Sequence, residues 1–467
     1  MTEAGNNYSE KKTQLHISVR NLVEFIFREG DIDNRSSRAM SADAMMEGTR
    51  IHRKIQGSMG KEYQAEVPLS LVVEGDLYEL TVEGRADGIF TEDGKCFVDE
   101  IKGMYRRVEL FEKPVFVHRA QAMCYAYIFA LQNNMETIGI QMTYCNLETE
   151  QTKYFREEFS FEEIKKWFDD LMEEYGKWAT FQCEMKNQRQ ASIKELNFPF
   201  EYRPGQKKLV SDVYRTIMRQ KLLFMQAPTG VGKTISTIFP AVKAVGEELA
   251  DRIFYLTAKT ITATVAKETF ALLEKNGYRA KTIQITAKEK LCPCDEMECN
   301  PVTCPYAKGH FDRVNDAVFD LLHRCEMIER DDILSQADRY TVCPFELCLD
   351  TASWCDNIIC DYNYVFDPNV YLKRFFQEGI KGDYIFLIDE AHNMVERSRQ
   401  MYSAQIYKED FLTVKRIMKE HSRSIEKALE KCNKILLGMK RECENYTVYD
   451  TFGNMVFSFM RLVTLLD

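Results

Sequence analysis

The stretch Leu222–Ile235, LLFMQAPTGVGKTI, is the part of the sequence that decides the fold. Its apolar beginning, Leu222 to Met225, predicts a buried parallel strand, and a helical pattern starts near Ile235. Between them lies a glycine-containing loop whose backbone N–H groups can converge on phosphate oxygens. A strand, a loop and a helix in this order predict a nucleotide site in an α/β fold.

This loop also carries the side chains that a nucleotide needs. Lys233 can reach the outer phosphates, and the Thr234 hydroxyl can ligate Mg²⁺. Ala227 stands where the usual motif begins with glycine, which leaves the GKT core intact. We therefore assign ATP binding to the following loop residues: Ala227, Thr229, Gly230, Gly232, Lys233 and Thr234.

A second apolar run, Tyr384–Ile388, predicts another buried strand, which ends in an acidic tip. Asp389 at this tip can hold Mg²⁺, and Glu390 can orient the water that attacks the γ-phosphate. A charged helix start is the plainer explanation, but the order of loop and acidic tip in one chain favours an ATPase. The predicted catalytic set of this ATPase is Lys233, Asp389, Glu390 and His392.

The 467 residues suggest two or three domains, and 45% hydrophobic with 29% charged residues is a globular composition. No apolar run is as long as a membrane span, and no secretory signal opens the sequence. Fifteen cysteines without such a signal predict a reducing, cytoplasmic setting with free or metal-bound thiols. Because the net charge is −10, contact with nucleic acid requires local basic surface.

Residues 1–182 predict a first α/β domain, in which a helix around His52 precedes several alternating strands. Asp87 and Glu100 fall on neighbouring strands, where they can share a hard divalent cation. Lys102 lies two residues past Glu100, so it projects from the same strand face and can position a water molecule. Gln121 and Tyr125 share one face of the helix that follows.

This region resembles the RecB-like group of the PD-(D/E)XK nucleases. Asp87 matches the first acidic position, Glu100-Ile101-Lys102 matches (D/E)XK, and Gln121 with Tyr125 matches the QxxxY element. His52 and Glu66 fit the upstream positions of the family, and Ala86 departs from its usual proline. The resemblance implies catalysis by Asp87, Glu100 and Lys102, Mg²⁺ or Mn²⁺ held by His52, Asp87 and Glu100, and DNA contacts from Gln121 and Tyr125.

A polar linker is predicted over residues 183–200, and a second domain begins at 201. Gln206 is a candidate to read the adenine edge, and an ordinary helix-start residue is the alternative. Thr257 and Lys259 follow another buried strand and are candidates to touch the DNA backbone.

Nine of the cysteines fall between Cys292 and Cys360. Paired CxxC motifs of a zinc ribbon are absent, and several of these cysteines precede proline, which favours an iron–sulfur site over zinc. The predicted cluster ligands are Cys292, Cys299, Cys304 and Cys343, with Cys294 as a spare or alternate ligand.

The phosphate loop, the cysteine insert, the segment Ile358–Tyr364 and the DEAH sequence together resemble the XPD/DinG-like iron–sulfur helicases of superfamily 2. The resemblance covers roughly residues 202–393. It implies a RecA-like domain at 201–398 with a 4Fe–4S cluster in an insert at about 286–350. It also implies ATP-driven, Mg²⁺-dependent unwinding of single-stranded or forked DNA in repair or processing.

Residues 399–467 read as the start of the family's helical arch, so we expect a truncated form that lacks the second RecA-like domain. Such a form is expected to bind nucleotide and single-stranded DNA without unwinding a fork. Two alternatives remain open. One is a metal-dependent nuclease whose ATPase half senses nucleotide, and the other is a nucleic-acid scaffold without either activity.

Overall fold

The computed structural model describes residues 12–35, 42–60, 62–228, 230–258, 260–377, 380 and 382–466. The chain forms two compact units. The first comprises residues up to 365 together with 370–391, and the second comprises 366–369 and 392–467. The nuclease-like and ATPase parts expected from the sequence therefore belong to the same unit. None of the described helices is long and apolar enough to cross a membrane.

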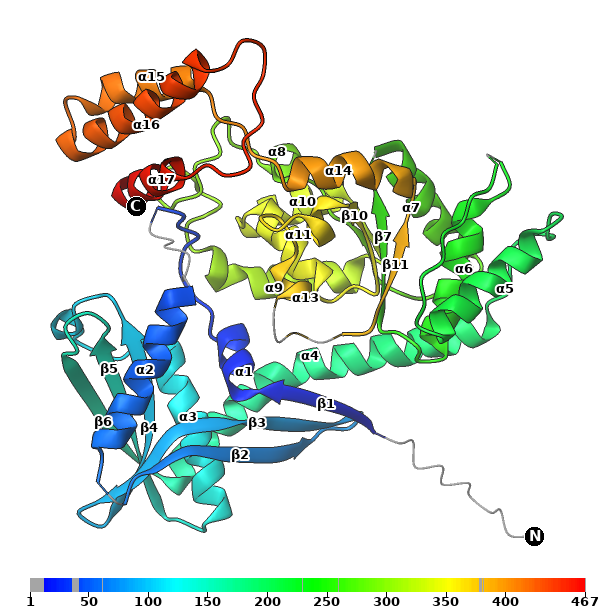
Figure 1. Cartoon of the computed structure of the whole chain (residues 1–467). Coiled ribbons are helices and arrows are strands. Elements are labelled where there is room, and N and C mark those ends of the chain that lie inside the picture. The colour runs from blue at the N-terminus through cyan, green and yellow to red at the C-terminus, as the bar shows by residue number, and fades with distance from the viewer. Residues whose placement is uncertain are drawn as a thin grey trace, which may run out of the picture. The chain divides into compact units, whose positions relative to one another are not determined.

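The N-terminal part is a mixed sheet in the order β1-β3-β4-β5-β6, with β2 paired to β3 (Figure 1). Its strands are β1 (Thr13–Ser18), β2 (Gln64–Glu74), β3 (Tyr78–Glu92), β4 (Lys95–Met104), β5 (Thr137–Asn146) and β6 (Thr152–Ser160). Its helices are α1 (Val19–Ile26), α2 (Ala42–Ser58), η1 (Val108–Leu110) and α3 (Phe116–Gln132). Strand β3 is continuous over its 15 residues.

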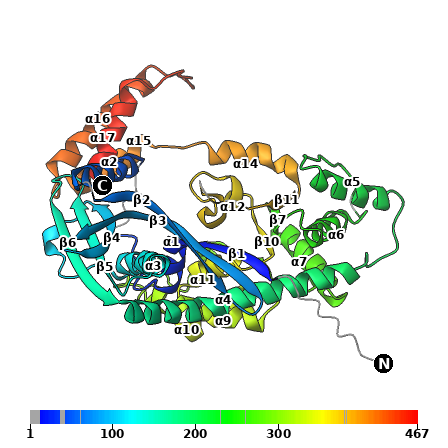
Figure 2. The same ribbon diagram turned by 90° about the horizontal axis from the view of Figure 1, so that it is seen from below.

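Helices α2 and α3 pack against opposite faces of β4, because the strand alternates its side chains (Figure 2). Ile101 faces Ile51 and Ile55 of α2, whereas Val98 belongs to the core that includes α3. Strands β4 and β5 are parallel and connected through α3, as such a crossover requires. This arrangement brings α2, β3, β4 and α3 together around Glu100.

Helix α4 (Phe161–Glu195) replaces the linker predicted at 183–200. A capping box of Ser160 and Glu163 begins the helix, and its apolar positions stay buried as far as Ile193. Arg189, which looked like a solvated linker charge, is buried and forms an ion pair with Asp356 at 2.5 Å. The prediction was wrong because the polar residues of this segment hide a buried helical stripe. The helix runs from the N-terminal sheet into the ATPase part (Figure 1).

The ATPase part is a parallel sheet in the order β11-β7-β10-β8-β9. Its strands are β7 (Arg252–Thr257), β8 (Thr282–Gln284), β9 (Met327–Ile328), β10 (Asn357–Asp361) and β11 (Tyr384–Ile388). Its helices are α5 (Gln206–Met218), α6 (Lys233–Gly246), α7 (Thr260–Lys275), α8 (Lys288–Leu291), α9 (His310–Arg324), α10 (Arg330–Tyr340), α11 (Pro344–Ala352), α12 (Asn363–Phe366) and α13 (Lys373–Phe376). Helices α6 and α7 cover the core built on β7.

The apolar run Leu222–Met225 is not a strand, contrary to prediction. The side chains of Leu222 and Phe224 are 89% and 88% exposed. Strand β11 ends the sheet order, and its Phe386 is 40% exposed, so this strand is less buried than predicted. An apolar run becomes a strand only where a sheet edge accepts its backbone, and none of the described strands pairs with this run.

The second unit is helical, as the pattern over 399–467 predicted. After η2 (Ala391–Asn393), its helices are α14 (Met394–Met401), α15 (Lys408–Met418), α16 (Arg423–Arg441) and α17 (Asn454–Leu466). Helices α16 and α17 share a small core around Leu429, Cys432 and Leu462.

Candidate functional sites

The phosphate loop leads directly into helix α6, which begins at Lys233. Gly230 and Gly232 adopt φ angles of 82° and 78°, a region that residues with a Cβ atom rarely enter. The Lys233 Nζ atom lies 3.1 Å from the carbonyl oxygen of Ala227, across the mouth of the loop. Backbone N–H groups at this helix N-terminus can bind phosphate. Thr229 lies outside the described residues.

Gln206 supports the phosphate loop from beneath. Its Nε2 atom donates to the Val231 carbonyl at 3.2 Å and lies 3.1 Å from the Ser236 Oγ atom. Its Oε1 atom accepts the Arg203 N–H at 3.0 Å. The side chain is buried, so in this arrangement its amide is committed to the protein, and adenine recognition by Gln206 stays a prediction.

We expect Gln206→Ala to weaken ATP and GTP binding equally. The change removes a donor from beneath Val231 and Ser236, and an unsatisfied buried polar group costs about 1–3 kcal/mol. The melting temperature of the nucleotide-free protein should fall as well. Equilibrium titration with both nucleotides measures the effect, and a selective loss of ATP affinity would support the role in adenine recognition.

Thr234 and Asp389 meet at a residue that the sequence did not single out, Tyr255 of β7. The Tyr255 hydroxyl interacts with both the Thr234 hydroxyl and the Asp389 carboxylate. Burial, and then the negative charge of Asp389, raise the pKa of Tyr255 well above its ordinary value. The two groups predicted to ligate Mg²⁺ therefore face the same point at the carboxyl end of the sheet. A tyrosine inside an apolar strand is usually a core residue, so the sequence alone did not identify Tyr255 as part of the site.

Tyr362 fixes the backbone of the acidic tip. Its buried hydroxyl donates to the carbonyl oxygens of Asp389 and, at 3.2 Å, of Glu390. Glu390 is exposed and has a φ of 49°, an uncommon conformation for a residue with a side chain. His392 belongs to the second unit. These contacts hold the Asp389 carboxylate near the phosphate loop.

The structure describes one of the two residues predicted to touch the DNA backbone. Thr257 is 4% exposed, and its hydroxyl is hydrogen-bonded to that of Thr262. The hydroxyl is therefore engaged within the protein in this arrangement, and a DNA contact from Thr257 stays a prediction. Thr257 is the last residue of β7, and α7 begins at Thr260. Lys259 lies outside the described residues.

The nuclease-like residues converge on Glu100 of β4. Lys102 Nζ lies 2.7 Å from Glu100 Oε1, which confirms that both project from one strand face. Asp87 of β3 accepts the Ile101 N–H at 2.7 Å through Oδ2, and its Oδ1 lies 3.4 Å from His52 Nδ1. Burial lowers the pKa of His52, but the hydrogen bond and charge of Asp87 outweigh it, so the pKa is raised overall.

Glu100 has the electrostatics of an incomplete cation site. It is 2% exposed, and its Oε2 atom has no hydrogen-bond partner among the described residues. Burial raises the pKa of Glu100 to about 8, although the Lys102 charge opposes this shift. A buried carboxylate with a vacant oxygen is costly unless a cation or a proton satisfies it. The donor set therefore suits a hard divalent ion.

Gln121 and Tyr125 are buried behind Lys102. The Gln121 Oε1 atom accepts from Lys102 Nζ at 3.2 Å, and Tyr125 interacts with Gln121. Their burial makes them positioning residues for Lys102, and a DNA contact from either side chain stays a prediction. Gln56 of α2 was missed by sequence reasoning. It donates to Glu66 Oε1 at 3.0 Å and to the Asp87 carbonyl at 2.9 Å, so it ties the upstream glutamate to the site.

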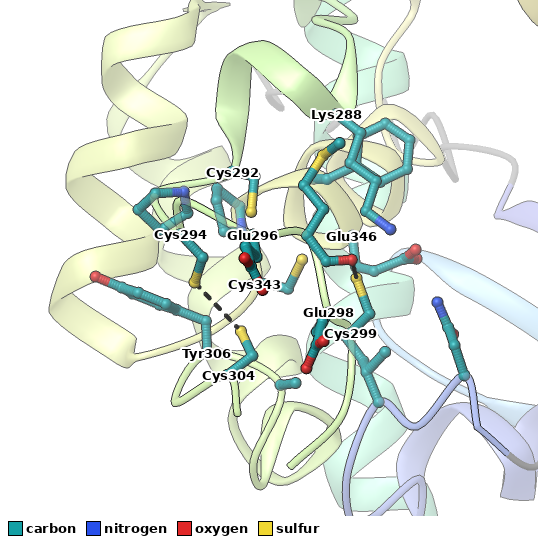
Figure 3. Close-up of a pocket in the computed structure, with 17 residues that line it drawn as sticks. Lys288, Cys292, Cys294, Glu296, Glu298, Cys299, Cys304, Tyr306, Cys343 and Glu346 are labelled. Carbon is teal, nitrogen blue, oxygen red and sulfur yellow. Dashed lines mark hydrogen bonds between the residues drawn. The ribbon is translucent and has the colours of Figure 1, made fainter. Parts of the chain in front are cut away.

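Five cysteines line one pocket in the insert, together with charged side chains that include Lys288, Glu296, Glu298 and Glu346 (Figure 3). These cysteines are Cys292, Cys294, Cys299, Cys304 and Cys343. The Cys294 and Cys304 sulfur atoms are 3.8 Å apart, which fits the prediction of Cys294 as an alternate ligand. Lys288 also lines the pocket and interacts with Cys299, so a positive charge faces the thiols.

In the described part of the chain, no three His, Cys, Asp or Glu side chains are arranged to hold a single metal ion. The cysteine pocket therefore brings thiols together without the ligand arrangement of a closed single-metal site. The carboxylate site does not need three such side chains, because Mg²⁺ often takes only one or two protein carboxylates and keeps its waters.

Comparison with known proteins finds similarity to helicases over part of the chain. Residues 271–411 match the DEAD_2 family model. The regulator of telomere elongation helicase 1 homolog of Caenorhabditis elegans is 20% identical over 256 residues, covering 45% of this chain and 25% of that protein. The XPD/RAD3 helicase subunit of transcription and DNA repair factor IIH from Saccharomyces cerevisiae is 23% identical over 232 residues, covering 42% and 29%.

A solved XPD helicase structure is 16% identical to the chain and superposes with a TM-score of 0.35, covering 56% of this chain and 51% of that one. The chain spans less than a third of the length of the two curated relatives. The chain is similar in sequence to the two curated helicases, and the family match at residues 271–411 agrees with the resemblance based on the sequence motifs.

Proposed function

We propose that the chain contains the first motor domain of an ATP-dependent DNA helicase of the XPD/DinG-like iron–sulfur type, fused to a nuclease-like domain. The observation that carries the proposal is the meeting of Thr234 and Asp389 at Tyr255, beside a phosphate loop that opens α6. Residues 271–411, which include Asp389, match DEAD_2 and support the same assignment. The proposed role is DNA repair or processing in the cytoplasm.

The proposed nucleotide chemistry follows from the positions of these groups. The loop N–H groups and Lys233 bind the phosphates, while Thr234 and Asp389 hold Mg²⁺ between them. Glu390 orients the attacking water, because it follows Asp389 directly at the strand tip. Hydrolysis then drives movement along single-stranded or forked DNA.

A metal-dependent DNA nuclease with a nucleotide-sensing ATPase is the second candidate. The convergence of His52, Asp87, Glu100 and Lys102, with an unsatisfied carboxylate oxygen, favours it. In this proposal, Asp87 and Glu100 hold Mg²⁺ or Mn²⁺, and Lys102 positions the water that attacks the phosphodiester. Both activities can coexist, since the two sites share no residue.

A comparison of labelled forked and single-stranded DNA separates the candidates. A helicase displaces the strand only with ATP and Mg²⁺, and the products keep their full length. A nuclease shortens the labelled strand in Mn²⁺ without ATP. Because the truncated form is expected to bind nucleotide without unwinding a fork, absence of displacement alone does not exclude the helicase assignment. DNA binding with neither nucleotide binding nor cleavage would favour the scaffold interpretation over both enzymes.

The cysteine pocket fits a 4Fe–4S cluster held by Cys292, Cys299, Cys304 and Cys343, a group that supplies a rigid cross-link to the insert when bound. We expect anaerobically purified protein to be brown and to carry about four irons per chain. Cys304→Ser should lose the colour and most of the iron, because it removes a thiolate ligand. Cys325→Ser, outside the pocket, is the matched control. Stoichiometric zinc without iron in the wild type would contradict the assignment.

A further inference from the structure

The segment Arg28–Arg35, called the strap here, connects α1 of the N-terminal sheet to the cysteine insert. Its backbone pairs with the insert at three points. The Ile32 N–H donates to the Ala307 carbonyl at 2.9 Å, and the Asn34 N–H donates to the Cys299 carbonyl at 2.9 Å. The Phe311 N–H donates to the Gly30 carbonyl at 3.0 Å. One of these acceptors therefore belongs to a predicted cluster ligand.

Side chains on both partners reinforce this docking. Asp31 of the strap accepts the Gly309 N–H at 2.6 Å, and Asp312 of the insert accepts the Gly30 N–H at 2.7 Å. Gly309 has a φ of 60°, so the insert backbone turns sharply at the point where Asp31 holds it. Arg28 lies 2.9 Å from Asp350 in an ion pair that is largely buried.

The strap also forms a wall of the cysteine pocket itself, because Ile32 and Asn34 line it together with the thiols. Just before the strap, Phe25 of α1 packs on Trp354, with ring centroids 5.7 Å apart. Trp178 packs on the same tryptophan, with ring centroids 4.5 Å apart. The pocket is thus assembled from two distant parts of the sequence. The strap contributes Ile32 and Asn34 to this wall, and the insert contributes the thiols.

We propose that the strap is a structural half of the metal site, so that metal binding in the cysteine pocket and docking of the nuclease-like domain on the insert are one coupled equilibrium. The inference rests on the proposed metal-binding role of the cysteines. A bound cluster fixes the loop from Cys292 to Cys304 and hence the carbonyl of Cys299 that accepts the Asn34 N–H. By linkage, the docked strap must tighten metal binding by the same factor.

Coupling free energies between protein sites are typically worth roughly 5- to 150-fold in affinity. Loss of the metal should therefore loosen the strap before it disturbs the sheet.

The test measures iron retention and amide exchange in the full chain. Asp31→Ala and, on the other partner, Asp312→Ala should each release iron to a chelator at least roughly five-fold faster than wild type, the lower end of typical coupling. Asp33→Ala is the matched control, since Asp33 pairs with Arg35 inside the strap at 2.7 Å. In metal-stripped wild type, the backbone amides of the strap should exchange with solvent at least roughly five-fold faster than in the metal-bound protein. The amides of β4 should stay protected.

The outcomes separate this proposal from the cluster assignment. Zinc in place of iron would contradict the 4Fe–4S assignment, but the same release and exchange measurements with zinc would still support the coupling. Equal release rates in Asp31→Ala, Asp312→Ala and Asp33→Ala, with strap exchange unchanged on stripping, would overturn the coupling. A pocket that binds neither metal would overturn both.

Discussion

Lys233→Ala should weaken Mg·ATP binding about 10- to 100-fold and slow any DNA-stimulated hydrolysis by about 10²- to 10³-fold. Lys233 begins α6 and lies across the mouth of the phosphate loop, 3.1 Å from the Ala227 carbonyl. A charge-assisted hydrogen bond contributes about 1.5–3 kcal/mol to binding, and each 1.4 kcal/mol is tenfold in affinity. Removal of one preorganised group that stabilises transition-state charge costs about 10²- to 10³-fold in rate.

Equilibrium binding of a fluorescent ATP analogue and phosphate release with single-stranded DNA measure the two effects. Lys207→Ala is the matched control, because it removes an exposed lysine of α5 beside the phosphate-loop support. Metal-dependent cleavage of DNA should be unchanged in both variants, since Lys233 lies outside the carboxylate site. Equal ATP affinities for the two variants would mean that nucleotide binds elsewhere.

The sequence was most informative where chemistry depends on short spacings. The step of two residues from Glu100 to Lys102 placed both on one strand face, and the ion pair at 2.7 Å confirms it. The glycines of the phosphate loop were identified from the motif, and their positive φ angles agree. Such features depend on local backbone geometry, which a single stretch of sequence determines.

The failures share a different cause, because each depended on a partner distant in sequence. Leu222–Met225 has the composition of a strand, but strand formation requires a sheet edge that pairs with it. The segment 183–200 has the composition of a polar linker, but Arg189 within it forms an ion pair with the distant Asp356. Gln206 reads as a surface amide until Val231 and Ser236 cover it. Tertiary contacts of this kind leave no periodic signal in the chain.

Mn²⁺ affinity at the carboxylate site should rise with pH, up to about tenfold per unit, and level off above pH 8. Burial raises the pKa of Glu100 to about 8, so in the metal-free protein a proton occupies the carboxylate near neutral pH. A metal ion must displace that proton, which makes binding pH-dependent. Glu100→Gln should lower Mn²⁺ affinity at least roughly 10- to 100-fold, the loss that even outer partners of a metal site cause.

The same proton makes a prediction for folding. Because the folded pKa of Glu100, about 8, exceeds its ordinary value of 4.5, its contribution to stability is fully present below pH 4.5. That contribution is lost as pH rises through 8, where the buried carboxylate must ionise. Metal-free wild type should therefore become less stable to urea between pH 5 and pH 8, and Glu100→Gln should remove much of this slope because the amide carries no charge.

Glu83→Gln is the control for both measurements, since Glu83 is an exposed glutamate on the neighbouring strand β3. At pH 8, Mn²⁺ at a concentration that saturates the wild type should restore the stability of the wild type to urea. The same concentration should leave the stability of Glu100→Gln unchanged, because only the ionised carboxylate gains a partner for its vacant oxygen. If Mn²⁺ affinity does not vary with pH in the wild type, Glu100 is not a ligand. The carboxylate would then be a buried polar group that serves only the fold, and the nuclease proposal would lose its main support.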